Sequence, residues 1–127
     1  MSVPRRASSV RLSSPCAALA VAKVLEDGDP GGHMRRAIER FPIPEVGADA
    51  LKRYFLPDGR PEGTPYTLLS MWQQTVSRAR QQITMLASFV EVHLAKEDHD
   101  GVVGINLLTK VQMPNLATLY GAMLAGV

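Results

Sequence analysis

The sequence predicts an α/β protein that is rich in helix. Apolar residues recur at helical spacing through most of the chain, whereas residues 102–108 form a branched apolar run without alternation. Such a run is typical of a strand that is buried on both faces of a parallel sheet. A loop and a stripe of helical spacing at 115–125 follow it, which is the order of a βα unit. The 127 residues amount to about half of the ~250 that a complete (β/α)8 barrel requires.

Composition and charge exclude several classes of protein. The chain has 46% apolar and 20% charged residues, which is typical of a globular domain. Its net charge of +2 is too close to balance to indicate nucleic-acid binding. No run of ~18 apolar residues is present, so we expect no membrane-spanning helix. The single cysteine, Cys16, excludes an intrachain disulfide and agrees with a reducing, cytoplasmic location.

The first half of the chain predicts a tail and then short helices. Residues 1–17 carry basic residues and no acid, and we expect a disordered tail there. Helical spacing predicts helices at 17–26, 33–41 and 46–55, and each is followed by a stretch rich in proline or glycine. Residues 57–65 contain three prolines and two glycines, so this stretch should be an exposed, irregular connection.

The segment after Ser70 is ambiguous. Six apolar positions from Trp72 to Val90 are spaced by three or four residues, as in one long amphipathic helix. Residues 83–87 are also a compact apolar run of strand length, and periodicity cannot assign such a run. The residues alone leave both structures open. Residues 88–96 have helical spacing again.

Glycines at a predicted helix start suggest an anion site. Gly31 and Gly32 precede Arg35 and Arg36, and free amides at a helix start attract anions. The segment lacks the Gly-Lys-Ser/Thr ending of a P-loop and the three-glycine spacing of a dinucleotide loop. A structural turn with a solvated arginine pair is therefore the favoured interpretation.

A metal site is imaginable around His93, Glu97 and His99. The histidine-glutamate-histidine spacing of zinc proteases is absent, and a solvated helix face followed by a turn is favoured. His99 titrates near neutral pH and is a conceivable general base, although no nucleophile can be named beside it.

Asn106 lies within the predicted strand at 102–108, and Lys110 and Gln112 follow in the loop. An amide inside an apolar strand is costly unless its hydrogen bonds are satisfied. Ligands of parallel α/β folds bind at the carboxyl ends of strands, which is where these residues stand. A polar rim that binds a ligand and an amide that caps local backbone are equally good interpretations.

A long stretch of the chain resembles a known family. Phe89–Pro114 and Leu119–Val127 resemble the nitronate monooxygenases, formerly called 2-nitropropane dioxygenases. Asp27–Ala37 and Arg53–Phe55 look like the same branch of that family, and the resemblance runs from about Ala18 to Val127.

The resemblance implies an FMN-dependent oxidoreductase that is built on a TIM barrel and oxidises alkyl nitronates with dioxygen. It implies a partial (β/α)8 barrel over 18–127, with two parallel barrel strands at 83–87 and 102–108. Residues 18–69 would be a helical insertion and 70–127 the βα units. The helices between and after the strands would be 89–97 and 115–125.

The resemblance also implies site residues. Asn106 matches the family's Gly-x-Asn position and is expected to contact the cofactor, and Lys110 and Gln112 match by sequence. Ser88 stands where relatives usually have asparagine, and Thr109 stands where an acidic residue is common.

The family's later strands, which supply the flavin phosphate site and the catalytic base, have no counterpart in these residues. Two barrel strands cannot enclose a flavin, so we expect this chain alone to be a truncated, inactive form that neither holds FMN tightly nor oxidises nitronates. The alternative is a non-catalytic α-rich module that self-associates or binds a protein partner through apolar faces.

Overall fold

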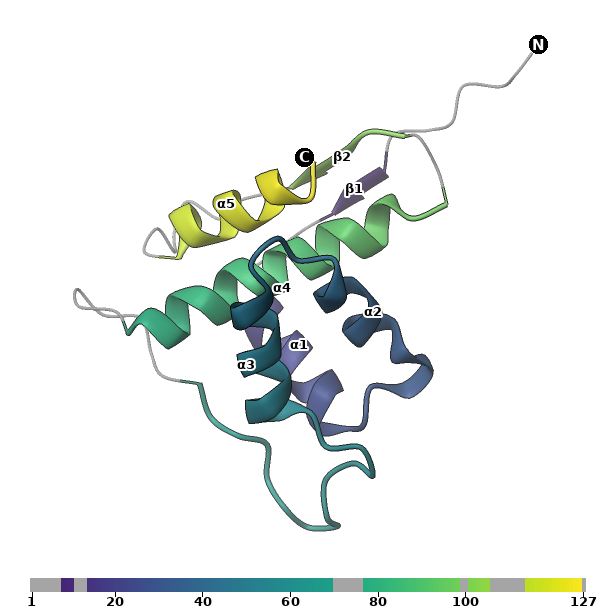
Figure 1. Cartoon of the computed structure of the whole chain (residues 1–127), viewed down its shortest axis with the longest axis vertical. Helices are drawn as coiled ribbons and strands as arrows, with labels where there is room; N and C mark the ends of the chain where they lie inside the picture. Colours follow the sequence, from purple (N-terminus) through teal and green to yellow (C-terminus); the bar gives the residue numbers. More distant parts are fainter. Residues whose placement is uncertain (1–7, 11–13, 70–76, 99–100, 106–113, 127) are drawn as a thin grey trace.

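The structure is a computed structural model of the whole chain, and it describes residues 8–10, 14–69, 77–98, 101–105 and 114–126. The described part is helix-rich, as predicted (Figure 1). Its elements in chain order are β1 (Ser8–Val10), α1 (Ser14–Glu26), the short 3-10 helix η1 (Pro30–Gly32), α2 (His33–Glu39), α3 (Pro44–Tyr54), α4 (Arg78–Lys96), β2 (Val103–Ile105) and α5 (Asn115–Leu124).

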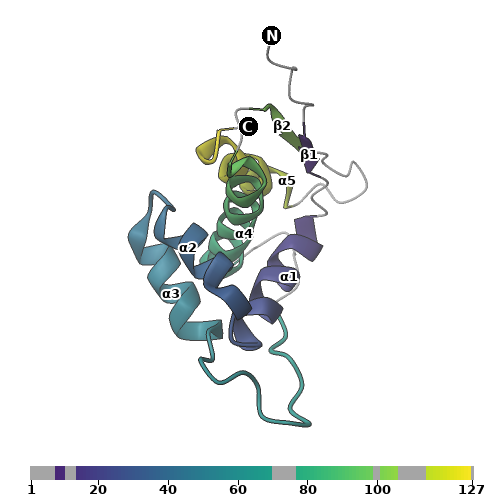
Figure 2. The same ribbon diagram turned by 90° about the vertical axis from the view of Figure 1, so that its right-hand side faces the viewer.

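Helix α4 lies at the centre of the molecule. Helices α1, α2 and α3 lie on one side of it, and α5 with the two strands lies on the other (Figures 1 and 2). α4 contacts each of these helices and both strands. No helix among the described residues is both long enough and apolar enough to cross a membrane.

The predicted strand at 83–87 is wrong, because these residues lie inside α4. The helix begins after Ser77, whose hydroxyl accepts a hydrogen bond from the Arg80 amide at 3.1 Å, and such caps stabilise helix starts. The five consecutive residues 86–90 are all buried. A helix that is covered on all sides is apolar on all sides, and its sequence then contains a run that resembles a strand.

The two strands form a parallel pair, with Ser8 opposite Val103 and Val10 opposite Ile105 (Figure 1). Parallel strands need a long crossover connection, and here helices α1 to α4 supply it. β2 lies within the predicted strand 102–108, of which residues 106–108 are outside the described residues.

The tail expected at 1–17 is partly structured. Ser8–Val10 is the strand β1, and α1 begins at Ser14 rather than Ala17. Three residues are too few to show a period of two, so this strand could not be predicted from its residues. The remaining residues of the predicted tail, 1–7 and 11–13, lie outside the described residues.

The other predicted helices are confirmed, and their ends differ by one or two residues. α2 corresponds to the helix expected at 33–41, α3 to that at 46–55 and α5 to that at 115–125. The connection at 57–65 is irregular and mostly exposed, as expected.

Helices α1, α2 and α3 bury one core against α4. Val21 and Leu25 of α1 are fully buried, and Ile38 of α2 is nearly so. Phe41 packs edge-on against Phe89 of α4, with ring centroids 5.1 Å apart. The hydrophobic contacts therefore join the short helices to the middle of α4.

Helix α5 packs against α4 through small residues. Thr118, Gly121 and Ala122 are buried, and the Ser88 hydroxyl donates a hydrogen bond of 2.6 Å to the Thr118 carbonyl. A Cβ atom added at Gly121 would overlap the Met85 carbonyl oxygen. Glycine is therefore required here by the close approach of two helix backbones, and not by its own backbone angles.

This close approach predicts a stability effect. Gly121→Ala should lower the free energy of unfolding by about 1–3 kcal/mol, because the two backbones must separate to admit the methyl group. Urea unfolding followed by circular dichroism measures the change. Gly104→Ala is the matched control, since a Cβ atom at Gly104 meets no atom within 4 Å. Equal losses in the two variants would contradict the packing described.

Candidate functional site

The predicted cofactor contacts lie outside the described residues. Asn106 directly follows the last residue of β2, and Lys110 and Gln112 precede α5 in the sequence. Their role remains a prediction. His99, the conceivable general base, also lies outside the described residues.

The glycine-rich turn before α2 is occupied by a carboxylate of the chain itself. Asp29 is 1% exposed. Its two oxygens accept hydrogen bonds from the amides of Met34 at 3.1 Å and Arg35 at 2.9 Å, and the Arg35 Nε atom donates a third at 3.1 Å. A negative charge at a helix start is stabilised by these amides and by the helix dipole. The turn is therefore structural, because Asp29 takes the place of an external anion.

The two arginines after this turn are exposed to solvent, as predicted, with 42% of the Arg35 side chain and 47% of the Arg36 side chain accessible, and each also forms an ion pair. Arg35 bonds Asp29 and lies over the ring of Phe55, with 4.6 Å from its guanidinium carbon to the ring centroid. Arg36 binds the Glu97 carboxylate through two hydrogen bonds, of 2.7 and 3.2 Å. This second pair joins α2 to the end of α4.

Glu97 is an ion-pair partner in this structure. The hydrogen bonds from Arg36 lower the pKa of Glu97 below its usual range, and the same contact raises the pKa of Arg36. His93 stacks on Phe89 instead, with centroids 5.5 Å apart. Among the described residues, no group of three His, Cys, Asp or Glu side chains is placed to hold a metal ion.

A second cluster of polar contacts joins the end of α1 to the connection at 57–67, and it was not predicted from the sequence. Tyr66 donates a hydrogen bond of 2.7 Å to Asp27, and Arg60 donates another of 3.2 Å. Arg60 also lies over the Tyr66 ring at 3.6 Å. The buried Glu26 accepts the Thr67 amide with both oxygens. These hydrogen bonds hold the irregular connection against α1. Polar residues in such a connection have no regular spacing, so their contacts cannot be predicted from periodicity.

The hydrogen bond from Tyr66 is the main cause of a lowered pKa at Asp27, and Arg60 adds to it. A lowered folded-state pKa means that the charged form is the stabilised one. The contribution is therefore present above the ordinary aspartate pKa of ~3.9 and is lost as the pH falls through the lower folded value.

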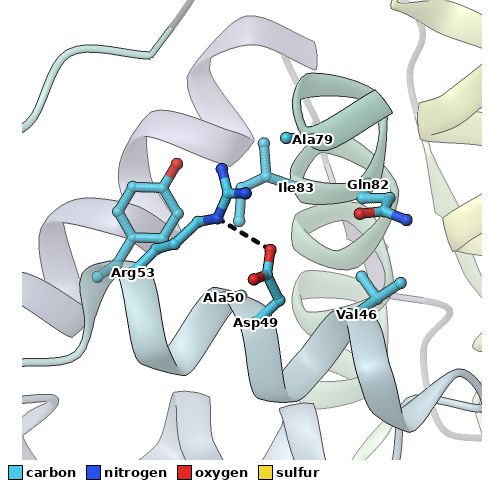
Figure 3. Close-up of a pocket in the computed structure, with 8 residues that line it drawn as sticks. Val46, Asp49, Ala50, Arg53, Ala79, Gln82 and Ile83 are labelled. Atoms are coloured by element: carbon cyan, nitrogen blue, oxygen red, sulfur yellow. Dashed lines mark ion pairs between the residues drawn. The ribbon is translucent and has the colours of Figure 1, made fainter. Parts of the chain in front are cut away.

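A small pocket lies between α3 and α4 (Figure 3). Its volume is about 10 Å³, enough for about one water molecule. Asp49 and Arg53 form an ion pair of 2.9 Å at its edge, and Gln82 and Ile83 line it from α4 (Figure 3). The pocket is too small for a substrate.

Two open clefts have the size of ligand sites, which are typically ~300–1,000 Å³. One, of about 430 Å³, lies beside Tyr54 and Arg80; Arg80 is buried, and this burial lowers its pKa. The other, of about 580 Å³, lies between α3, α4 and α5. Its lining residues are Ile43, Val46, Arg78, Gln81, Gln82, Met85, Leu116, Ala117 and Tyr120.

None of these three cavities is lined by histidine, cysteine or glutamate. Their linings are mostly apolar, with arginine and amide groups among the polar residues.

The comparisons with known proteins identify no relative. No protein-family model, no curated protein and no solved structure matches the chain.

The cap at Asp29 predicts a loss of stability on its removal. Asp29→Ala should lower the free energy of unfolding by about 1–2 kcal/mol, because the Met34 and Arg35 amides lose their acceptor. Asp58→Ala is the control, since Asp58 is exposed in the connection. Urea unfolding measures both, and an unchanged midpoint in Asp29→Ala would contradict the cap.

The Tyr66 contact predicts a change in titration. Tyr66→Phe should raise the Asp27 pKa toward its ordinary value, and only in part, because Arg60 remains. The carboxyl carbon of Asp27, followed by nuclear magnetic resonance during an acid titration, measures it. Tyr120→Phe removes a hydroxyl elsewhere and should leave Asp27 unchanged. An Asp27 titration that is identical in Tyr66→Phe and the unmodified chain would contradict the assignment.

Proposed function

We propose that the chain is a section of an FMN-dependent oxidoreductase of the nitronate monooxygenase type, with alkyl nitronates as the substrate class. The observation that carries the proposal is the parallel pairing of β1 and β2 across a helical crossover, followed by α5. This is the order of βα units in barrels. The resemblance of Phe89–Pro114 to that family is the second support.

The proposed partial barrel differs from the one expected from sequence. Its two neighbouring strands are β1 and β2, and α1 to α4 form the whole connection between them. Asn106 then follows the carboxyl end of β2, the end at which barrels bind their ligands. Asn106, Lys110 and Gln112 remain the proposed cofactor contacts.

Two features of the described residues count against a bound FMN. None of the three cavities is lined by residues of β1 or β2. The amides at the start of α2, which could have bound a phosphate, are used by Asp29. We propose that this chain alone neither binds FMN tightly nor oxidises nitronates. A cytoplasmic location, based on the single Cys16, is part of the same proposal.

An α-rich module that self-associates or binds a protein partner is the second candidate function. It is favoured by one specific observation: four large apolar side chains of α5 are exposed, namely Leu116, Leu119, Tyr120 and Met123. Large exposed apolar patches mark interaction sites.

The absorption spectrum of the purified chain tests the first candidate. We expect no flavin bands after gel filtration, and no oxidation of a nitronate when FMN is added. Yellow protein with close to one FMN per chain would contradict the claim that this section alone cannot hold the cofactor, and would strengthen the family assignment.

The DNA on either side of the gene tests the family itself. We expect it to encode further βα units, in frame or in another frame, because a barrel needs strands beyond β1 and β2. Flanking DNA that encodes no such strands in any frame would overturn the proposal.

A further inference from the structure

Helix α5 has its small residues inward and its large apolar residues outward. Thr118, Gly121 and Ala122 are buried against α4, whereas the outward positions follow each other by three, one and three residues. That spacing places them on one face of a helix. We call this face the α5 stripe: Leu116, 80% exposed, Leu119, 36%, Tyr120, 49%, and Met123, 61%.

The α5 stripe is unusual for a surface that faces water. Half of the eight large apolar side chains that are exposed in the described part of the chain lie on this one helix. The helix contains no charged residue between Asn115 and Leu124. A solvent-facing helix normally carries charges on its outer face. The composition of this face is that of a helix with a partner.

The stripe continues into the larger of the two open clefts described above. Leu116 and Tyr120 belong to the stripe and also line the cleft of about 580 Å³ between α3, α4 and α5. Val46 and Met85 supply apolar walls on the other two helices. An apolar ridge and an apolar cleft are therefore adjacent and share residues.

We propose that a second copy of this chain docks here, with the α5 stripe of each copy seated in the cleft of the other. A two-fold interface requires one surface that is complementary to itself, and a ridge beside a cleft of the same chemistry meets this requirement. The inference rests on the second candidate function, self-association, and names its surface and occupant.

Charge does not oppose a second copy as the occupant. Helix α5 has no charged side chain, so burying it against the cleft carries no cost of desolvating a charge. The one charged residue that lines the cleft is Arg78, which is exposed in the single chain and can keep its guanidinium in water while its stem packs.

The size of the surface indicates a weak dimer. With large side chains of about 200 Å² each, the exposed fractions of the stripe give about 450 Å² per copy. Two copies bury about 1,000 Å² or more when the cleft walls are included, which is the low end for specific interfaces. We therefore expect a reversible dimer whose population rises with concentration.

Sedimentation velocity of the full chain over a concentration series tests the proposal. We expect the unmodified chain to pass from monomer to dimer. Leu116→Glu should weaken dimerisation at least tenfold, because it places a charge in the interface. Leu68→Glu is the matched control: Leu68 is 92% exposed, lies outside α5 and does not line this cleft, so the variant should dimerise like the unmodified chain.

Folding of each variant is checked by circular dichroism, and Met123→Glu is a second variant on the stripe if Leu116→Glu does not fold. A chain that is monomeric at all concentrations overturns both the dimer and the self-association function. A dimer that survives Leu116→Glu and Met123→Glu overturns only the proposed surface. Equal weakening by Leu68→Glu would indicate non-specific apolar association, and species larger than a dimer would exclude the two-fold arrangement; either result overturns the proposal.

Discussion

The rest of the structure depends on the burial of the middle of α4 on all of its sides. Five consecutive buried residues, 86–90, span more than one helical turn, so other elements cover this stretch on every side, whereas Arg78 and Gln81 near the start of α4 are exposed. Helices α1 to α3 cover one side, and α5 with the strands covers the other. Helix α5 lies very close to α4. Gly121 lies against the Met85 carbonyl, and the Ser88 hydroxyl donates a hydrogen bond to the Thr118 carbonyl.

The same burial explains which parts of the fold could be predicted from sequence. α2, α3 and α5 were predicted because each has a buried and an exposed face, and because proline or glycine marks their ends. The residues alone left 83–87 open between helix and strand, because an apolar run without a polar face has no period that excludes a strand, and only the family resemblance implied a strand there. β1 could not be predicted, because the three residues Ser8–Val10 pair with a strand far along the chain.

The candidate site was predictable only where its contacts are local. Gly31 and Gly32 correctly indicated a turn before a helix, yet they could not show that Asp29 fills the amides that follow. Arg36 and Glu97 are 61 residues apart in the chain. Sequence patterns relate only residues within a few positions of each other, so they could not predict this ion pair. The amides that could have bound an anion thus bond Asp29, and the carboxylate of Glu97 bonds Arg36. Only the fold brings Arg36 and Glu97 together.

The two candidate functions make competing demands on one surface. In a longer barrel, the helix and strand that follow α5 would lie beside it and cover its apolar face, as barrel helices cover one another. In a dimer, the second copy would cover that face. Leu116 and Tyr120 cannot be buried by both, so any protein that contains the further βα units should lose the ability to pair through α5. The uncovered stripe therefore connects the two proposals: if the chain is a barrel section, pairing through α5 replaces the contacts that the barrel would have made.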